Sequence, residues 1–261
     1  MFALQQVEYR TVAPLFAGID HNAALVHAVI EGSSPGRVYR SGADQPACAL
    51  VIMDGAFSYL GGETVNADEC KALVGLLFDD LLPASAEKEL VLFVFAEQSR
   101  QMLAPYMQER GVITIQRKVF SFDPERFALR SGWRTQIPQG MTLRAVDAEL
   151  AQKRPDLVPR FEPESRRFGF CLLEEDKVVS LCSAVAVGGG EAEIDIFTCE
   201  EYRGRGLATL TASAFIEACI ECGLTPAWSC WPYRAGSYAL AKKLGFDERP
   251  DVPAFYWAEA M

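Results

Sequence analysis

The residues with the clearest chemical potential form a short turn, RGRGLA, at residues 203–208. Its two arginines carry positive charge, and its two glycines let the backbone adopt conformations that other residues resist. The turn precedes an apolar segment with helical spacing, and a helix N-terminus presents unpaired N–H groups and a partial positive charge. These features predict a site for a phosphate or diphosphate group. The alternative is a solvated basic helix start beside Glu200 and Glu201.

Two carboxylates precede the turn, at positions where they could move protons. Glu193 and Asp195 are two residues apart in EAEIDIFT, which alternates as a strand does, so both side chains lie on one face. A carboxylate there can accept a proton from a substrate, directly or through water. The alternative is that this face meets solvent or pairs with an arginine of a neighbouring strand.

The elements around these residues alternate between strand and helix patterns. Two strand patterns, RFGFCLLEED and KVVSLCSAVAVG, precede EAEIDIFT, and LATLTASAFIEACIECG follows the turn as a helix stopped by Gly223. TPAWSCW is then expected as a strand, AGSYALAKKLG as a helix ending at Gly245, and a final strand pair runs through AFYWAEA. The second half is therefore predicted to be a mixed α/β unit whose RGRGLA turn joins a strand to a helix.

The first half repeats this order of elements. Strands are expected in RVYRS, CALVIMD, AFSYLGGE, ELVLFVFAE and VITIQRKVFSF, and helices in NADECKALVGLLFDDLL and SRQMLAPYMQERG. We therefore predict two α/β domains in tandem, over residues 1–130 and 131–261, joined by a connector at about residues 122–140. The alternative is that the same order recurs by chance.

Only the second half carries the arginine-glycine turn. The equivalent segment of the first half is SYLGGETVNADE, which has glycines but no arginine and places Glu63 and Asp68 where an anion would bind. Carboxylates would repel a diphosphate, so one anion site is expected, in the second half.

The overall charge and hydropathy limit the classes of partner. The formal net charge is −10, and both halves are acidic, with 12 basic and 16 acidic residues in 1–140 (−4) and 13 and 19 in 141–261 (−6). Because nucleic-acid binding depends on neutralising phosphates with Lys and Arg, nucleic acid is not expected as a partner. No long apolar run or leader pattern is present, so we expect a cytoplasmic protein without a membrane segment.

The eight cysteines do not suggest disulfides or a metal site. Most are scattered through apolar stretches such as FGFCLL and ACALVIM, where Cys behaves as a small buried hydrophobe. The one CxxC, Cys219 to Cys222, lies near the end of a helical pattern without a second pair or a nearby histidine. Reduced thiols and no bound metal are expected.

Two motifs together carry a family resemblance. RGRGLA resembles the R/Q-x-x-G-x-G/A signature of the GNAT superfamily, the acyl-CoA-dependent N-acyltransferases, and SYALAKKLGF is similar to its second signature. The resemblance covers residues 141–261, whereas the first half matches only in element order and would be a degenerate copy. It implies a mixed, mostly antiparallel sheet flanked by helices, present twice in tandem.

The resemblance also implies which residues contact coenzyme A. The loop amides would hold the pyrophosphate, and the preceding strand would bind the pantetheine arm through its backbone while splaying away from the next strand. Carried over residue by residue, the contacts are Arg203, Gly204, Arg205, Gly206, Leu207 and Ala208 at the pyrophosphate, Phe197 and Thr198 along the pantetheine, and Ser237 on the far side.

The implied reaction is direct transfer of an acetyl group from acetyl-CoA to a primary amine of a small molecule or peptide. Glu193 and Asp195 are the candidate bases, and many family members use a tyrosine as the acid where this chain has Ala241. Tyr238, one helical turn earlier, is the candidate replacement, with Tyr233 as a second choice; each could instead be a packing residue. Trp228 and Trp231 could line an apolar or cation-binding pocket or belong to the core.

The sequence is also compatible with two other functions. The missing tyrosine is compatible with a non-catalytic sensor that binds acyl-CoA, although proximity alone can accelerate acyl transfer considerably. An interaction protein would bind no coenzyme at all. The identity of the acceptor and the oligomeric state are not encoded in any pattern that we recognise.

Overall fold

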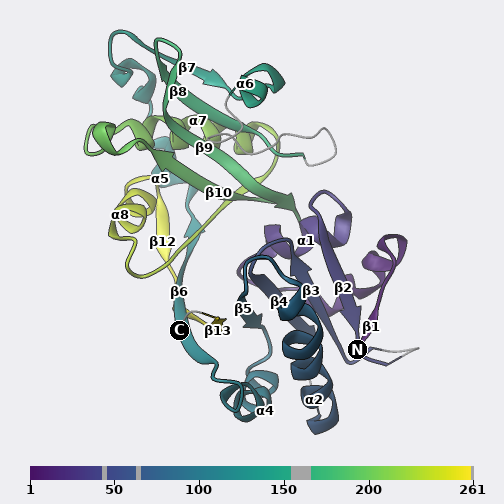
Figure 1. Ribbon diagram of the computed structural model, residues 1–261. Helices are drawn as coiled ribbons and strands as arrows, with labels where there is room; N and C mark the ends of the chain where they lie inside the picture. The colour runs from purple at the N-terminus through teal and green to yellow at the C-terminus, as the bar shows by residue number, and fades with distance from the viewer. Residues whose placement is uncertain (43–45, 63–65, 154–165, 260–261) are drawn as a thin grey trace. The chain divides into compact units, whose positions relative to one another are not determined.

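The computed structural model describes residues 1–42, 46–62, 66–153 and 166–259. The chain divides into two compact units, unit 1 (Met1–Arg117 and Asp251–Met261) and unit 2 (Lys118–Pro250). The ribbon in Figure 1 follows their elements in chain order. The division differs from the expected boundary between residues 130 and 131, because the chain enters unit 2 within a strand and its last strand folds with unit 1.

Unit 1 is a sheet with helices on its faces. Its elements are β1 (Phe2–Ala3), η1 (Gln6–Phe16), α1 (Ala23–Glu31), β2 (Gly36–Arg40), β3 (Cys48–Met53), β4 (Phe57–Gly62), α2 (Ala67–Gly75), η2 (Leu76–Leu81), α3 (Leu82–Ala84), β5 (Glu89–Val94), α4 (Glu97–Gln108), the first half of β6 (Ile113–Phe122), and β13 (Val252–Ala258). The strand order is β1-β2-β3-β4-β5-β13-β6, antiparallel except for the parallel pair β4–β5.

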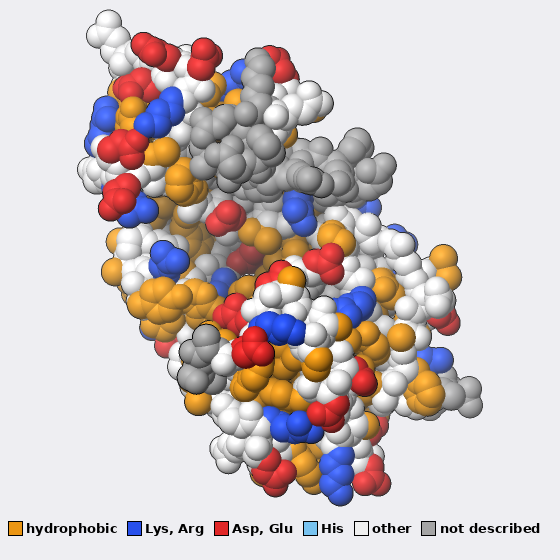
Figure 2. Space-filling view, viewed as in Figure 1, with side chains coloured by type: hydrophobic (Ala, Val, Ile, Leu, Met, Phe, Trp, Pro, Cys, Tyr) orange, Lys and Arg blue, Asp and Glu red, His pale blue; other side chains and the backbone are white. Residues whose placement is uncertain are grey.

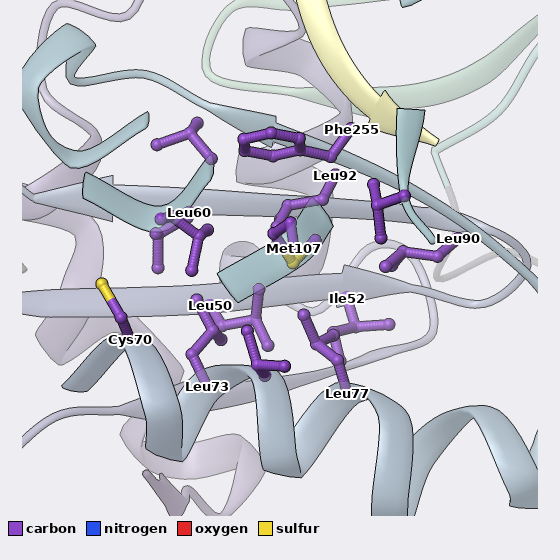
Figure 3. Close-up of a cluster of buried hydrophobic side chains, with 14 of the residues drawn as sticks. Leu50, Ile52, Leu60, Cys70, Leu73, Leu77, Leu90, Leu92, Met107 and Phe255 are labelled. Carbon is purple, nitrogen blue, oxygen red and sulfur yellow. The ribbon is translucent and has the colours of Figure 1, made fainter. Parts of the chain in front are cut away.

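The core of unit 1 shows why the C-terminal strand belongs to it. In Figure 3, Leu73 and Leu77 project from the helical segment toward the sheet residues Leu50 and Ile52. Phe255, from β13, lies in the same cluster and is 4% exposed. Burying such a side chain favours the folded state by about 2 kcal/mol, which helps to hold β13 between β5 and β6.

Unit 2 has the same architecture. Its elements are the second half of β6, α5 (Pro124–Ala128), η3 (Trp133–Gln136), β7 (Met141–Ala145), α6 (Ala148–Lys153), β8 (Gly169–Glu174), β9 (Lys177–Gly188), β10 (Glu191–Thr198), η5 (Glu200–Tyr202), α7 (Leu207–Glu221), β11 (Thr225–Cys230), α8 (Ala235–Lys243) and β12 (Phe246–Glu248). The strand order is β7-β8-β9-β10-β11-β6-β12, and only β10–β11 is parallel.

The two units share one order of elements and one pairing scheme. In each, four strands are followed by a helix, a parallel strand, a second helix and a last strand. In unit 1, β13 lies between β5 and β6. In unit 2, the second half of β6 takes the corresponding place between β11 and β12. The mixed, mostly antiparallel α/β fold predicted from the sequence is confirmed.

The predicted connector at residues 122–140 is a folded part of unit 2. Phe127 and Trp133 are buried in the clusters beneath the sheet of this unit. The indole Nε1 of Trp133 donates a hydrogen bond of 2.7 Å to Glu217 in α7. Polar and Pro/Gly-containing sequence in this segment therefore marks turns between short helices rather than a free linker.

The surface and the thiols are consistent with an ordinary acidic globular protein. Figure 2 shows Lys and Arg side chains scattered among Asp and Glu side chains on the face in view, without a continuous basic region among the described residues. None of the eight cysteines, all of which lie in the described parts of the chain, forms a disulfide bond, and burial raises the pKa of Cys219 to about 12. In the described parts of the chain, no helix combines the length and the apolar character that crossing a membrane requires.

Candidate functional site

The strands β10 and β11 pair at one end and diverge at the other. Their parallel register covers only Glu191, Ala192 and Glu193 on β10, and the rest of β10 pairs with β9 alone. A register shift in the β9–β10 ladder follows Glu193, where Val185 of β9 is an extra residue. Bulges of this kind bend strands and are frequent beside active sites. The splay expected from the sequence motif is therefore present in unit 2.

The diverging part of β10 exposes backbone groups on its β11 side. The N–H of Cys199 donates to Val179 of β9 and the carbonyl of Phe197 accepts from Ser180, so these residues direct their backbone groups toward β9. Because backbone polarity alternates along an antiparallel ladder, Ile196 directs its C=O to the open side, whereas its N–H donates to the Asp195 carboxylate. Such an edge can pair with an extended ligand that carries amide groups.

The RGRGLA turn has the glycine conformations that the sequence predicted. Gly204 and Gly206 have φ angles of +76° and +79°, which L side chains rarely adopt. Helix α7 begins at Leu207, and Gly206 caps it without any side-chain acceptor. No described heavy atom other than chain neighbours lies within 4 Å of the position that a Cβ at Gly206 would occupy. The helix start is therefore open to a ligand.

Both arginines of the turn are exposed at its rim. The Nε of Arg203 donates to the carbonyl of Thr198 at 3.4 Å, which ties the turn to the end of β10. The guanidinium carbon of Arg205 lies 5.1 Å from the centre of the Tyr202 ring, a cation–π distance. Each arginine is thus oriented by a neighbour and still has guanidinium N–H groups for an anion.

The residues after the turn contribute backbone rather than side chains. Leu207 is 1% exposed and packs with Trp133 and Leu210, so its side chain cannot contact a coenzyme. Ala208 is partly buried. Their N–H groups, in the first turn of α7, are the groups that could bind phosphate oxygens.

The two carboxylates of β10 differ in environment. Glu193 is 4% exposed, and its Oε1 accepts a hydrogen bond of 2.6 Å from the Ser229 hydroxyl on β11. Asp195 retains exposed surface along the open edge, yet the protein atoms around its carboxylate limit hydration and raise its pKa. A hydrogen bond from the Ile196 N–H opposes this shift. Asp195 is therefore both reachable and more basic than an ordinary aspartate.

Sequence reasoning missed Ser229 as the partner of Glu193. The sequence indicated only the face on which Ser229 lies, because it alternates with Trp228 and Cys230, which are both buried in the core on the α7 side. Trp228 consequently belongs to the core rather than to a ligand pocket. Its indole Nε1 donates to the Ser237 hydroxyl at 3.0 Å, so Ser237 is fixed at the start of α8 and retains its own proton.

The candidate acid, Tyr238, donates its hydroxyl proton to a carboxylate of β12. Its hydroxyl donates to Oε2 of Glu248 on β12 at 2.6 Å. Lys118 contacts the other carboxylate oxygen at 2.7 Å, and both contacts lower the pKa of Glu248. The Tyr238 hydroxyl proton is therefore directed to Glu248 of β12. Tyr233, the second choice, is 73% exposed.

A family model described as GNAT acetyltransferase matches residues 13–255. The chain belongs to the GNAT acetyltransferase family. The match extends over nearly the whole chain, which corrects the expectation that the resemblance would be confined to residues 141–261. The RGRGLA turn and the splayed strands thus occur in a chain of which both units are matched by the family model.

Similar proteins match this chain over nearly its full length. An uncharacterized N-acetyltransferase, YdfB of Bacillus subtilis, is 27% identical over 98% of this chain and 99% of its own. A GCN5-related N-acetyltransferase-like protein from Streptococcus suis has a similar fold, with a TM-score of 0.67, 23% identity and coverage of 96% of this chain and 98% of its own. A tandem GNAT protein from the clavulanic acid biosynthesis pathway has a TM-score of 0.64 and 14% identity, over 100% and 98%.

The family's usual acid position is structural in this GNAT protein. Ala241 is fully buried against Trp228 and Phe246, so a tyrosine at this position would need the core to repack. Within the described ranges, no cluster of three or more His, Cys, Asp or Glu side chains is arranged to hold a metal ion.

The equivalent region of unit 1 is closed in two respects. The Asn66 side chain caps α2 by accepting from the N–H groups of Asp68 and Glu69, both at 3.0 Å, and the Glu69 carboxylate accepts from the Asn66 N–H at 2.9 Å. The strands β4 and β5 also stay paired, through Leu60 and Val94. Of the two carboxylates expected to repel an anion, Asp68 lies in the first turn of α2, whereas Glu63 lies outside the described residues.

Proposed function

We propose that this GNAT protein transfers an acetyl group from acetyl-CoA to a primary amine of a small molecule or peptide. The observation that carries this proposal is the open edge of β10 together with the start of α7, whose N-cap residue Gly206 offers no side-chain acceptor to the first N–H groups. One extended ligand could pair with the strand edge and place a diphosphate at the helix N-terminus. Two strands paired along their whole length would not accept the extended part of the ligand. A helix whose first N–H groups are capped by a side chain would not accept the diphosphate.

The proposed coenzyme contacts follow from this geometry. Gly204 and Gly206 let the turn approach the pyrophosphate, Leu207 and Ala208 contribute N–H groups, and Arg203 and Arg205 supply charge at the rim. Phe197 and Thr198 line the pantetheine arm at the end of β10, and Ser237 contacts the coenzyme from α8. The bound thioester would supply an activated acetyl group, and the protein would orient it and remove the proton of the amine.

Asp195 is the better of the two candidate bases. It combines exposed surface on the open edge with a raised pKa, whereas Glu193 is buried and already accepts the Ser229 hydroxyl. We assign to Glu193 the role of a positioning residue, which lies two residues from Asp195 on the same face of β10 and links this strand to Ser229 of β11. The carboxylate of Asp195 also suits a cationic amine acceptor.

A titration with acetyl-CoA followed by a screen of amine acceptors for thiol release tests the proposal. Binding with turnover on at least one amine supports the enzyme. Tight binding without turnover on any acceptor would favour the alternative, a non-catalytic acyl-CoA sensor, for which the hydrogen bond between Tyr238 and Glu248 is the specific argument. Absence of binding would contradict both and leave an interaction protein.

We also expect one coenzyme per chain. The shared element order leads us to propose that the units are tandem copies of one fold, but α2 is capped by Asn66 and β4 does not diverge from β5. Isothermal titration calorimetry should therefore give a stoichiometry of one acetyl-CoA per chain. Two equivalent sites would contradict the argument from the capped helix.

Replacing Tyr238 by phenylalanine is expected to change turnover by less than about threefold, because its proton is directed to Glu248 rather than to a leaving thiolate. Steady-state kinetics at saturating acetyl-CoA provide the measurement. A loss of about a hundredfold would instead identify Tyr238 as the general acid, acting after it releases Glu248.

A further inference from the structure

A buried group of hydroxyls connects the end of β10 to the beginning of α7. Ser180 of β9 and Thr211 of α7 have no exposed surface, and Ser180 stands opposite Thr198 in the β9–β10 register. The Ser180 Oγ lies 2.9 Å from the Thr198 Oγ1 and 3.3 Å from the Thr211 Oγ1. It also donates to the carbonyl of Phe197 at 3.1 Å.

The protons of this group can be assigned by counting. A hydroxyl donates once and accepts up to twice. Because Ser180 donates to the Phe197 carbonyl, it accepts from Thr198, and it can also accept from Thr211. Thr211 has two further acceptors in reach, the carbonyls of Ala208 at 3.3 Å and Leu207 at 3.5 Å. Ser180 is then fully hydrogen-bonded, as a buried hydroxyl should be.

This group spans the two proposed parts of the coenzyme site. Phe197 and Thr198 form the end of the strand that would bind the pantetheine arm, and Leu207 and Ala208 form the helix start that would bind the pyrophosphate. The chain between them, residues 199–206, is exposed or half-exposed, so few contacts of its own fix its conformation. Buried contacts at its two ends therefore determine their separation. Resting on the proposed function, we propose that Ser180 and Thr211 are positioning residues that set the spacing between the pantetheine and pyrophosphate subsites.

The same proton count gives the hydrogen-bonding role of the Thr198 hydroxyl. Its one proton goes to Ser180, so its Oγ1 faces any ligand as an acceptor only. An amide N–H of the pantetheine arm is the group that such an oxygen recognises. The Thr198 carbonyl meanwhile accepts from Arg203, which adds a second link between the strand end and the turn.

Fixed spacing should matter only for a ligand that uses both subsites. A ligand that spans two sites gains affinity from their preorganised separation, whereas a fragment that occupies one site does not. Acetyl-CoA spans both, and adenosine 3′-phosphate 5′-diphosphate reaches only the pyrophosphate subsite. The difference between their affinities therefore separates positioning from general stability.

The test compares four variants by calorimetry with both ligands. Ser180→Ala and Thr211→Val each remove one hydroxyl, Thr211→Ser restores it, and Ser213→Ala is the matched control. Ser213 is equally buried in α7, but its hydroxyl has no hydrogen-bond partner among the described residues. Thermal unfolding of every variant checks that the fold is retained.

We expect Ser180→Ala and Thr211→Val to weaken acetyl-CoA binding about tenfold and nucleotide binding less than about twofold. Thr211→Ser and Ser213→Ala should match the wild type for both ligands. Equal losses for the two ligands, or unchanged acetyl-CoA affinity in both folded variants, would overturn the positioning role. A wild-type protein that binds neither ligand would instead overturn the proposed function.

Discussion

Replacing Gly206 by valine is expected to abolish acetyl-CoA binding, with a loss of affinity of at least about a hundredfold. Apart from its chain neighbours, no described heavy atom lies within 4 Å of the position that the valine Cβ would take, so the new side chain would extend into the open space at the start of α7. That space is where the diphosphate is proposed to bind. A β-branched residue also resists the φ of +79° and would pull the turn out of shape.

The matched control for this variant is Gly190→Val. Gly190 lies in the turn between β9 and β10, with the same φ of +79° and equally open surroundings. It therefore incurs a similar backbone strain, of order 1–3 kcal/mol, without an N–H group of α7 beside it. Calorimetry with acetyl-CoA should show near-normal affinity for folded Gly190→Val and none for folded Gly206→Val. Equal affinities in the two variants would remove the diphosphate site from the turn.

Local patterns predicted most of the elements but not their long-range pairing. Alternation in VITIQRKVFSF predicted the strand β6, and the pattern ending at Gly223 predicted α7. Nothing local indicates that β6 serves both units or that β13 inserts between β5 and β6, because strand partners are chosen by burial and register across the whole chain. The same reason explains why the division at residues 117 and 250 differs from the expected boundary.

Some features of the candidate site could be predicted from the sequence, and others could not. The glycines of the turn were identified by residue type, since a left-handed conformation is an intrinsic property of glycine. The Asn66 cap of α2 could also have been predicted, because Asn66 and Glu69 have the spacing of a capping box. The contacts between Glu193 and Ser229, and between Tyr238 and Glu248, join residues from different elements. No local pattern carries such pairs, so the roles of the two side chains had to come from the fold.

Asp195→Asn is expected to lower turnover by about a hundredfold or more at saturating acetyl-CoA, with little change in coenzyme affinity. An amine acceptor with a pKa near 10.4 is almost wholly protonated at neutral pH, so it needs a base. Because desolvation raises the pKa of Asp195 above 3.8, the wild-type rate should fall on the acid side at a pH above that of an ordinary aspartate. This acid limb should be absent from the residual rate of the variant.

Glu193→Gln is the comparison for this variant, because its amide oxygen can still accept the Ser229 hydroxyl. We expect it to retain turnover within about tenfold. If Asp195→Asn keeps full turnover across the pH range while Glu193→Gln loses it, the two roles must be exchanged. If neither loses turnover, the amine gives its proton to solvent or to another group.

The stability of Asp195→Asn supplies an independent check on the same carboxylate. A raised pKa in the folded state means that the folded protein binds more protons than the unfolded chain between the two pKa values. The stability linked to Asp195 is therefore present below pH 3.8 and is lost as pH rises through the raised pKa. Asparagine carries no charge, so the variant should be at least as stable as the wild type at neutral pH, and this difference in stability should shrink as the pH falls toward 4.

Urea unfolding at several pH values measures the free energy of unfolding of both proteins. A variant that is less stable than the wild type at neutral pH would contradict a poorly hydrated carboxylate at this position. We therefore expect Asp195→Asn to be more stable than the wild type at neutral pH and to have lost turnover. This combination is expected when a poorly hydrated carboxylate destabilises the folded protein but is required for catalysis.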